Sequence, residues 1–331
     1  MSALNDAFRK RSAVGLWLSG EAAWTVQGHE QGPSTEELGA AGIRASLVPA
    51  PLPFGARLGS LRAPAAAALG LDAGTPVIAG VNDGTASMLG AGLRFAGDAV
   101  DTGGTSGGLG IYADAPVDVP GLFLAPAPLP GRWVVGGAMA ALGASADWLR
   151  GPILGGLSMD QLQAAAAEVP SGAGGLVFQP YLAGERAPVF DDDARGAFFG
   201  LTLAHDARHL ARAVLEGAAF AMRSVAEPLA AAGAPIRELR LTGRPGGSDA
   251  WARIKADVLG APVAIPAVGD TAVLGAAILA ATGVGAVASL EAGVASMTSV
   301  VRRVEPDPAT RATYDSAYAV YRGLYPALRD A

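Results

Sequence analysis

Residues 76–114 read PVIAGVNDGTASMLGAGLRFAGDAVDTGGTSGGLGIYAD and carry the pattern that decides the fold. The apolar run at 76–81 predicts a strand, and the small residues at 85–93 predict a helix. Two further strands are expected at 98–102 and 109–114, joined by the glycine-rich turn GGTSGG. Strands that alternate with helices indicate an α/β protein.

The alternation of strands and helices continues toward the C-terminus. Residues 206–232 give the clearest helix, because apolar side chains recur there at steps of three or four residues. A strand is expected at 175–182, followed by a polar loop at 183–196. Proline and glycine crowd 115–131, which we interpret as a long surface loop. A buried helix is expected at about 271–282, because alanine and glycine dominate its uncharged run.

Composition limits the classes of protein to which this chain can belong. Its 331 residues suggest two domains, and its 51% of hydrophobic residues argues against a disordered chain. A net charge of −6 argues against nucleic acid or an anionic membrane surface as the main partner. The chain has no cysteine, which excludes disulfides, thiolate catalysis and cysteine-ligated metal centres. This composition is compatible with the reducing cytosol, and we expect a cytoplasmic protein.

Asp83 is the first candidate functional residue. It follows the apolar strand at 76–81 and precedes a helix. Ligands of open α/β sheets bind at such strand ends, where a carboxylate can take a proton from a hydroxyl group. An aspartate just before a helix also serves as an N-cap for free backbone N–H groups. Its position alone leaves both interpretations open.

The turn at 103–108 is the second candidate. Glycines let the backbone approach an anion closely, and successive N–H groups can form a concave phosphate site. A simple hairpin turn is the alternative. Residues 104–108 also fit the G-x-S-x-G pattern of hydrolases, with Ser106 as nucleophile. That pattern needs a helix directly after the serine, whereas a strand is expected here, so hydrolase chemistry is disfavoured.

The segment 241–248, LTGRPGGS, joins an expected strand to an expected helix. Small residues there can admit a flat ligand, and a helix N-terminus can bind a polar group. Taken alone, the segment is a capping turn with Ser248 as the cap. No Walker-type phosphate loop occurs in the chain, and no set of metal-ligating residues is predicted.

In this order and spacing the motifs resemble those of the FGGY carbohydrate kinases, most nearly the xylulokinase-like branch. The matching stretches are residues 74–92, 101–108, 178–223, 241–265 and 270–285. The resemblance implies an actin-like ATPase fold, also called ribonuclease H-like, with an incomplete first domain and a complete second domain. It assigns 1–95 to the sugar-binding domain and 96–331 to the nucleotide-binding domain of FGGY type.

The resemblance also implies a role for each candidate residue. Asp83 would be the general base, with Asn82 and Gly84 beside it in the substrate site. The phosphate-binding loop would consist of Gly103, Gly104, Thr105, Ser106 and Gly107. The adenosine-side residues would be Gly243, Arg244, Gly247 and Ser248. Kinases of this family use ATP with Mg²⁺, and phosphoryl transfer needs positioning, charge neutralisation and one proton acceptor.

Three departures from the family pattern stand out. The family begins with a D-x-G-T phosphate loop, which is not found at the start of this chain, so we expect the N-terminal part of the first domain to be missing. Asp72, Gly74 and Thr75 resemble that loop but precede a strand instead of following one. Arg244 stands where the family usually has glycine, and Gly84 stands where xylulokinases often have asparagine.

The expected function is ATP-dependent phosphorylation of a sugar hydroxyl, in a pentulose such as xylulose or in a related sugar or polyol. Activity impaired by N-terminal truncation is part of this expectation. The alternatives are a kinase-derived protein that binds a nucleotide or partner without catalysis, and the hydrolase with Ser106. The expected partners are the sugar, ATP and a second copy of the chain or a complementary N-terminal fragment, with no nucleic acid and no membrane.

Overall fold

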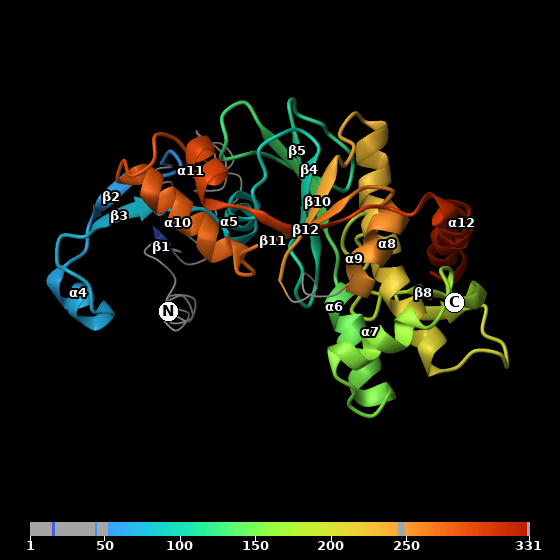
Figure 1. The fold of residues 1–331 in the computed structure, drawn as a ribbon. Coiled ribbons are helices and arrows are strands. Elements are labelled where there is room, and N and C mark those ends of the chain that lie inside the picture. The colour runs from blue at the N-terminus through green and yellow to red at the C-terminus, as the bar shows by residue number, and fades with distance from the viewer. Residues whose placement is uncertain (1–14, 17–43, 45–51, 244–248, 330–331) are drawn as a thin grey trace. The chain divides into compact units, whose positions relative to one another are not determined.

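A computed structural model describes residues 15–16, 44, 52–243 and 249–329 (Figure 1). The chain divides into two compact units, each made of several segments. The first unit consists of residues 1–95, 125–133 and 270–299. The second unit consists of residues 96–124, 134–269 and 300–331.

The first unit contains a small mixed sheet in the order β1 (Gly15–Leu16), β3 (Pro76–Ala79) and β2 (Arg57–Ser60). The central strand β3 runs parallel to β1 and antiparallel to β2. Its apolar residues Val77, Ile78 and Ala79 are buried, as the apolar run in the sequence predicts. Strand β3 thereby fixes the point from which the following helix starts.

Four helices of the first unit are described. They are α4 (Ala63–Leu69), α5 (Asp83–Gly90), α10 (Thr271–Gly283) and α11 (Leu290–Met297). The helix predicted at 271–282 is confirmed as α10, but only Thr271, Gly275, Ile278 and Leu279 are buried, and its other residues are half-buried. No helix among the described residues is long and apolar enough to cross a membrane.

Helices α5 and α10 approach each other at two glycines. A Cβ atom on Gly90 would lie 1.9 Å from the carbonyl oxygen of Thr271, and one on Gly275 would lie 1.8 Å from that of Ala86. Both distances are far below a van der Waals contact, so each helix requires glycine where it meets the backbone of the other. A hydrogen bond of 2.6 Å between the hydroxyl groups of Ser87 and Thr271 fixes the register of the pair.

The second unit is built on a seven-stranded sheet (Figure 1). Its strands are, in spatial order, β12 (Val300–Val304), β11 (Val263–Pro266), β10 (Glu238–Leu241), β4 (Asp98–Asp101), β5 (Gly108–Ala113), β7 (Trp133–Ala138) and β6 (Phe123–Pro126). Strand β10 runs parallel to both β4 and β11, whereas β4 and β5 form an antiparallel hairpin.

Helices and a short ribbon complete the second unit. The elements are α6 (Leu142–Trp148), α7 (Met159–Ala167), β8 (Val177–Gln179), β9 (Ala197–Phe199), α8 (Ala207–Ala231), α9 (Asp249–Leu259) and α12 (Arg311–Leu328). Helix α8 confirms the predicted helix at 206–232. Asp206 caps it, and most of its residues from Ala211 to Leu229 are buried.

One loop prediction and one strand prediction are wrong in detail. Strand β6 lies inside 115–131, which was expected to be surface loop, and it forms the outer edge of the large sheet. An edge strand tolerates proline and exposed side chains, so its sequence lacks the usual strand pattern. In the strand expected at 175–182, only β8 is regular, and it pairs antiparallel with the unpredicted β9.

Candidate active site

Asp83 is the first residue of α5, and residues 80–82 connect it to the end of β3, the central strand of the small sheet. The helix cap is Asn82, whose side-chain oxygen accepts a hydrogen bond of 2.7 Å from the N–H of Thr85. Asp83 is exposed, and its Oδ1 accepts a hydrogen bond of 2.8 Å from the N–H of Gly84. The capping role considered for Asp83 is therefore filled by its neighbour, and the carboxylate is accessible.

The glycine-rich turn connects β4 to β5 and is closed by a 3.0 Å hydrogen bond from the N–H of Thr102 to the carbonyl of Gly108. Gly103, Gly104 and Gly107 have φ angles of 61°, 85° and 115°. Side chains strongly disfavour these positive angles, so the turn requires its glycines. The turn starts from a buried strand, which gives it a rigid base.

The N-terminal end of helix α6 packs against this turn and forms hydrogen bonds with it. The N–H groups of Leu142 and Ala144 donate hydrogen bonds of 2.7 and 2.8 Å to the carbonyls of Ser106 and Thr105. Gly143 makes this approach possible, because a Cβ atom there would lie 2.0 Å from the carbonyl oxygen of Gly104. Gly143 is not among the predicted site residues, although the run of small residues at the start of α6 is a signal of close packing.

The hydrogen bonds to α6 orient the peptide groups of the turn. In a trans peptide the carbonyl and the following N–H point in opposite directions. Because the carbonyls of Thr105 and Ser106 point toward α6, the N–H groups of Ser106 and Gly107 point away from it. Neither N–H donates a hydrogen bond to another residue that the structure describes. The turn thus offers free backbone donors, as an anion site requires.

Gly243 lies close to this turn, because β10 and β4 are neighbouring parallel strands. Their last residues, Leu241 and Asp101, are paired. Thr242 donates two hydrogen bonds to the carbonyl of Asp101, from its N–H at 3.2 Å and from its hydroxyl at 2.9 Å. The two predicted nucleotide segments therefore both follow the C-terminal ends of neighbouring parallel strands, which is where α/β proteins bind their ligands.

The remaining sequence predictions have mixed outcomes. Arg244, Gly247 and Ser248 lie outside the described residues. Strand β5 begins at Gly108, where a hydrolase nucleophile elbow would have a helix after Ser106, so the turn is not such an elbow. Within the described part of the chain, no group of three or more histidine, aspartate or glutamate side chains could hold a metal ion.

Glu185 is a second residue that the sequence analysis did not single out. The residue is only 2% exposed, and its Oε1 accepts hydrogen bonds from the N–H groups of Ala140 at 2.8 Å and Arg186 at 2.7 Å. Oε2 has no hydrogen-bond partner among the described residues. Burial raises the pKa of this carboxyl to about 7. Glu185 thereby links the predicted polar loop to the segment just before α6.

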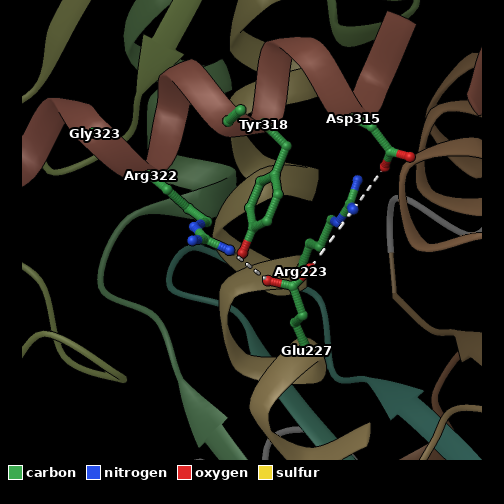
Figure 2. Close-up of a pocket in the computed structure, with 7 residues that line it drawn as sticks. Arg223, Glu227, Asp315, Tyr318, Arg322 and Gly323 are labelled. Carbon is green, nitrogen blue, oxygen red and sulfur yellow. Dashed lines mark hydrogen bonds and ion pairs between the residues drawn. The ribbon is translucent and has the colours of Figure 1, made fainter. Parts of the chain in front are cut away.

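A pocket of about 410 Å³ lies between α8 and α12 (Figure 2). Arg223 pairs with Asp315 at 2.7 Å, and Arg322 pairs with Glu227 at 3.2 Å, on either side of the Tyr318 ring. The charges of these four groups cancel. None of the predicted site residues lines this pocket, so it is separate from the candidate site.

The chain is similar to several carbohydrate kinases. Residues 99–284 match the C-terminal domain of the FGGY family of carbohydrate kinases. The chain is 33% identical to the gluconokinase of Bacillus licheniformis over 277 residues, covering 80% of this chain and 54% of the relative. It is 30% identical to the xylulose kinase of Bacillus subtilis over 292 residues, covering 87% and 58%. The chain thus spans about half the length of the curated relatives that it matches.

Solved structures show the same fold. The xylulose kinase from Rhodospirillum rubrum superposes with a TM-score of 0.79 at 35% identity, covering 90% of this chain and 60% of that one. The ligand-bound xylulose kinase from Lactobacillus acidophilus gives a TM-score of 0.82 at 26% identity, with 89% and 60% covered. The fold is the α/β, actin-like ATPase fold. With the family match over more than half of its length, the chain belongs to the FGGY family of carbohydrate kinases.

Proposed function

We propose that this chain contributes to the ATP-dependent phosphorylation of a sugar hydroxyl. The observation that carries the proposal is the turn at 103–108, which points free N–H groups away from α6 beside the end of β10. Residues 96–331 would form the nucleotide-binding domain, and residues 1–95 would belong to the sugar-binding domain. A kinase that draws on the ATP pool of the cell works in the cytoplasm, where we expect this chain.

Each part of the nucleotide has a proposed binding segment. Gly103, Gly104, Thr105, Ser106 and Gly107 would hold the phosphates of ATP through backbone N–H groups and two hydroxyls. Gly243, Arg244, Gly247 and Ser248 would lie against the adenosine. Mg²⁺ commonly binds through substrate phosphates and few protein groups, and we propose that it arrives bound to ATP. It would neutralise charge on the phosphates during transfer.

Asp83 would serve as the general base of the reaction. Its carboxylate takes the proton of the sugar hydroxyl as the oxygen attacks the γ-phosphorus, and ADP leaves with the electrons of the broken bond. Asn82 and Gly84 would line the same substrate site. Exposure of the Asp83 carboxylate and its freedom from helix capping support this role.

The names of the relatives support a proposal for the substrate class. They include xylulose kinases, gluconokinases and a glycerol kinase. We propose a pentulose such as xylulose, or a related sugar or polyol. A second copy of the chain or a complementary N-terminal fragment would be its macromolecular partner.

The test is a coupled assay of ADP release with pentuloses, gluconate and glycerol. Asp83→Asn should lower the rate by about 10²- to 10⁴-fold, the usual contribution of a general base. Asp72→Asn is the matched control. Asp72 is also an exposed carboxylate of the first unit, and no role in the site is predicted for it. Equal rates for wild type and Asp83→Asn would overturn the proposed role of Asp83.

The second candidate function is nucleotide binding without catalysis. In that case calorimetry would show one ATP bound per chain, but no acceptor sugar would increase the rate of ADP release. Restoration of turnover by an added N-terminal fragment of a relative would favour the kinase instead.

A further inference from the structure

A buried ion pair lies directly beneath the proposed phosphate turn. The ammonium group of Lys255, on α9, contacts the carboxylate of Asp101, the last residue of β4. Each side chain is only 2% exposed. The aliphatic chain of Lys255 also brings its Nζ 4.7 Å from the centre of the Trp251 ring. Both charges are therefore removed from water and depend on each other.

Asp101 makes contacts in three directions. Its Oδ2 accepts a hydrogen bond from Lys255, and its Oδ1 accepts one of 2.9 Å from the N–H of Gly103. Its backbone carbonyl accepts the two hydrogen bonds from Thr242. One residue thus contacts the first glycine of the phosphate turn, the residue before Gly243, and the helix that follows the adenosine-side segment.

Stability alone does not account for this pair. Removing two charges from water costs more than a well-packed apolar pair would, and replacing buried ion pairs by apolar residues is often neutral or stabilising. An apolar side chain at position 101 would, however, leave the N–H of Gly103 without its acceptor. The hydrogen bond from residue i+2 to an aspartate side chain is the contact that bends the backbone of a turn.

We propose that Asp101 and Lys255 are positioning residues that hold the turn at 103–107 in the conformation that receives the phosphates of a nucleoside triphosphate. Lys255 orients the Asp101 carboxylate through their direct contact. Asp101 in turn fixes Gly103, while α6 fixes the far side of the turn through Thr105 and Ser106. This inference rests on the proposed nucleotide role of the turn, but its structural part can be measured without any nucleotide.

Two double variants separate positioning from stability. Asp101→Asn/Lys255→Met and Asp101→Val/Lys255→Met both remove the two buried charges and keep side chains of similar size. Only the asparagine retains an oxygen that can accept the Gly103 N–H. We expect both variants to unfold within a few degrees of each other. Where the valine variant fails to fold, Asp101→Ala/Lys255→Met replaces it, since the smaller side chain avoids overpacking.

The first measurement is hydrogen exchange of the 102–108 segment without nucleotide. We expect exchange at least tenfold faster in the valine variant than in the asparagine variant, with exchange in α8 unchanged. The second measurement is the Kd for ATP by calorimetry. It should rise at least tenfold in the valine variant and stay within about threefold of wild type in the asparagine variant.

The outcomes are distinguishable. Equal exchange of 102–108 in the two double variants overturns the positioning role of the Asp101 carboxylate. Unequal exchange with equal affinity for ATP overturns the link between this turn and the nucleotide. If wild type itself holds no ATP, the proposed function fails, and the exchange rates still decide whether Asp101 and Lys255 position the turn.

Discussion

Glu185 shows how a single buried carboxyl makes stability depend on pH. The ordinary pKa of 4.5 rises to about 7 in the folded chain, because burial disfavours the charged form more than the two N–H donors and the Arg186 charge favour it. A raised pKa means that the folded state binds the proton more tightly than the unfolded state. The resulting stability is fully present below pH 4.5 and is lost as the pH rises through 7.

We predict that the free energy of unfolding of wild type, minus that of Glu185→Gln, falls by about 2–3 kcal/mol between pH 5 and pH 8. The glutamine keeps an oxygen for the N–H groups of Ala140 and Arg186 but cannot ionise. Urea unfolding of both proteins at four pH values measures the difference. A difference that stays constant with pH would contradict the assigned environment of Glu185.

Asn82 also acts at the scale of one residue. Its side chain caps α5 through the N–H of Thr85, so Asn82→Ala should lower the free energy of unfolding by about 1 kcal/mol. Asn82→Asp keeps an acceptor at the same place and should remain within a few tenths of wild type. Thermal or urea unfolding of the three proteins tests this. Equal losses in both variants would show that capping is not the role of this side chain.

At the scale of elements, the contact of α5 with α10 sets the position of Asp83. Gly275→Ala would place a methyl group 1.8 Å from the carbonyl oxygen of Ala86, so the two helices must move apart. We expect a loss of about 1–3 kcal/mol in stability, as for other overpacked sites. The ADP-release rate should fall as well, because α5 carries Asp83.

Gly323→Ala provides the control for this prediction. Gly323 lies on α12, is exposed, and a Cβ atom there meets nothing within 4 Å. Alanine is the better helix former, so this variant should be stabilised by up to about 1 kcal/mol. Differential scanning calorimetry compares both variants with wild type. A Gly275→Ala protein as stable as wild type would mean that α5 and α10 are free to shift.

For the whole molecule, local sequence patterns predicted most helices and strands, but they did not predict which residues distant in sequence contact one another. The periodicity of α8 and the glycine-rich connection of β4 to β5 are properties of continuous segments, and both were predicted. The role of Gly143 depends on a turn some forty residues earlier, and the partner of Asp101 lies on α9. Spacing along the chain does not encode such pairs, since they form only when the sheet assembles.

One sequence signal pointed to the hidden pair. Lys255 falls four residues after Trp251 and three before Val258, on the face of α9 that is buried. A charged side chain on an apolar stripe requires a buried partner of opposite charge. The edge strands β6 and β9 offered no comparable signal, because short exposed strands follow no strict alternation.

The glycine contact between α5 and α10 also determines when, during synthesis, Asp83 can reach its position in the folded chain. The interval between these helices contains most of the second unit, residues 96–124 and 134–269. During synthesis, α5 leaves the ribosome long before α10 has been made. The surface of α5 around Ala86 and Gly90, which packs against α10 in the folded chain, stays exposed during that interval. The proposed proton acceptor, Asp83, can therefore take its final place only after α10 has been translated, and a nascent chain stalled before residue 271 would carry Asp83 without the helix against which α5 packs.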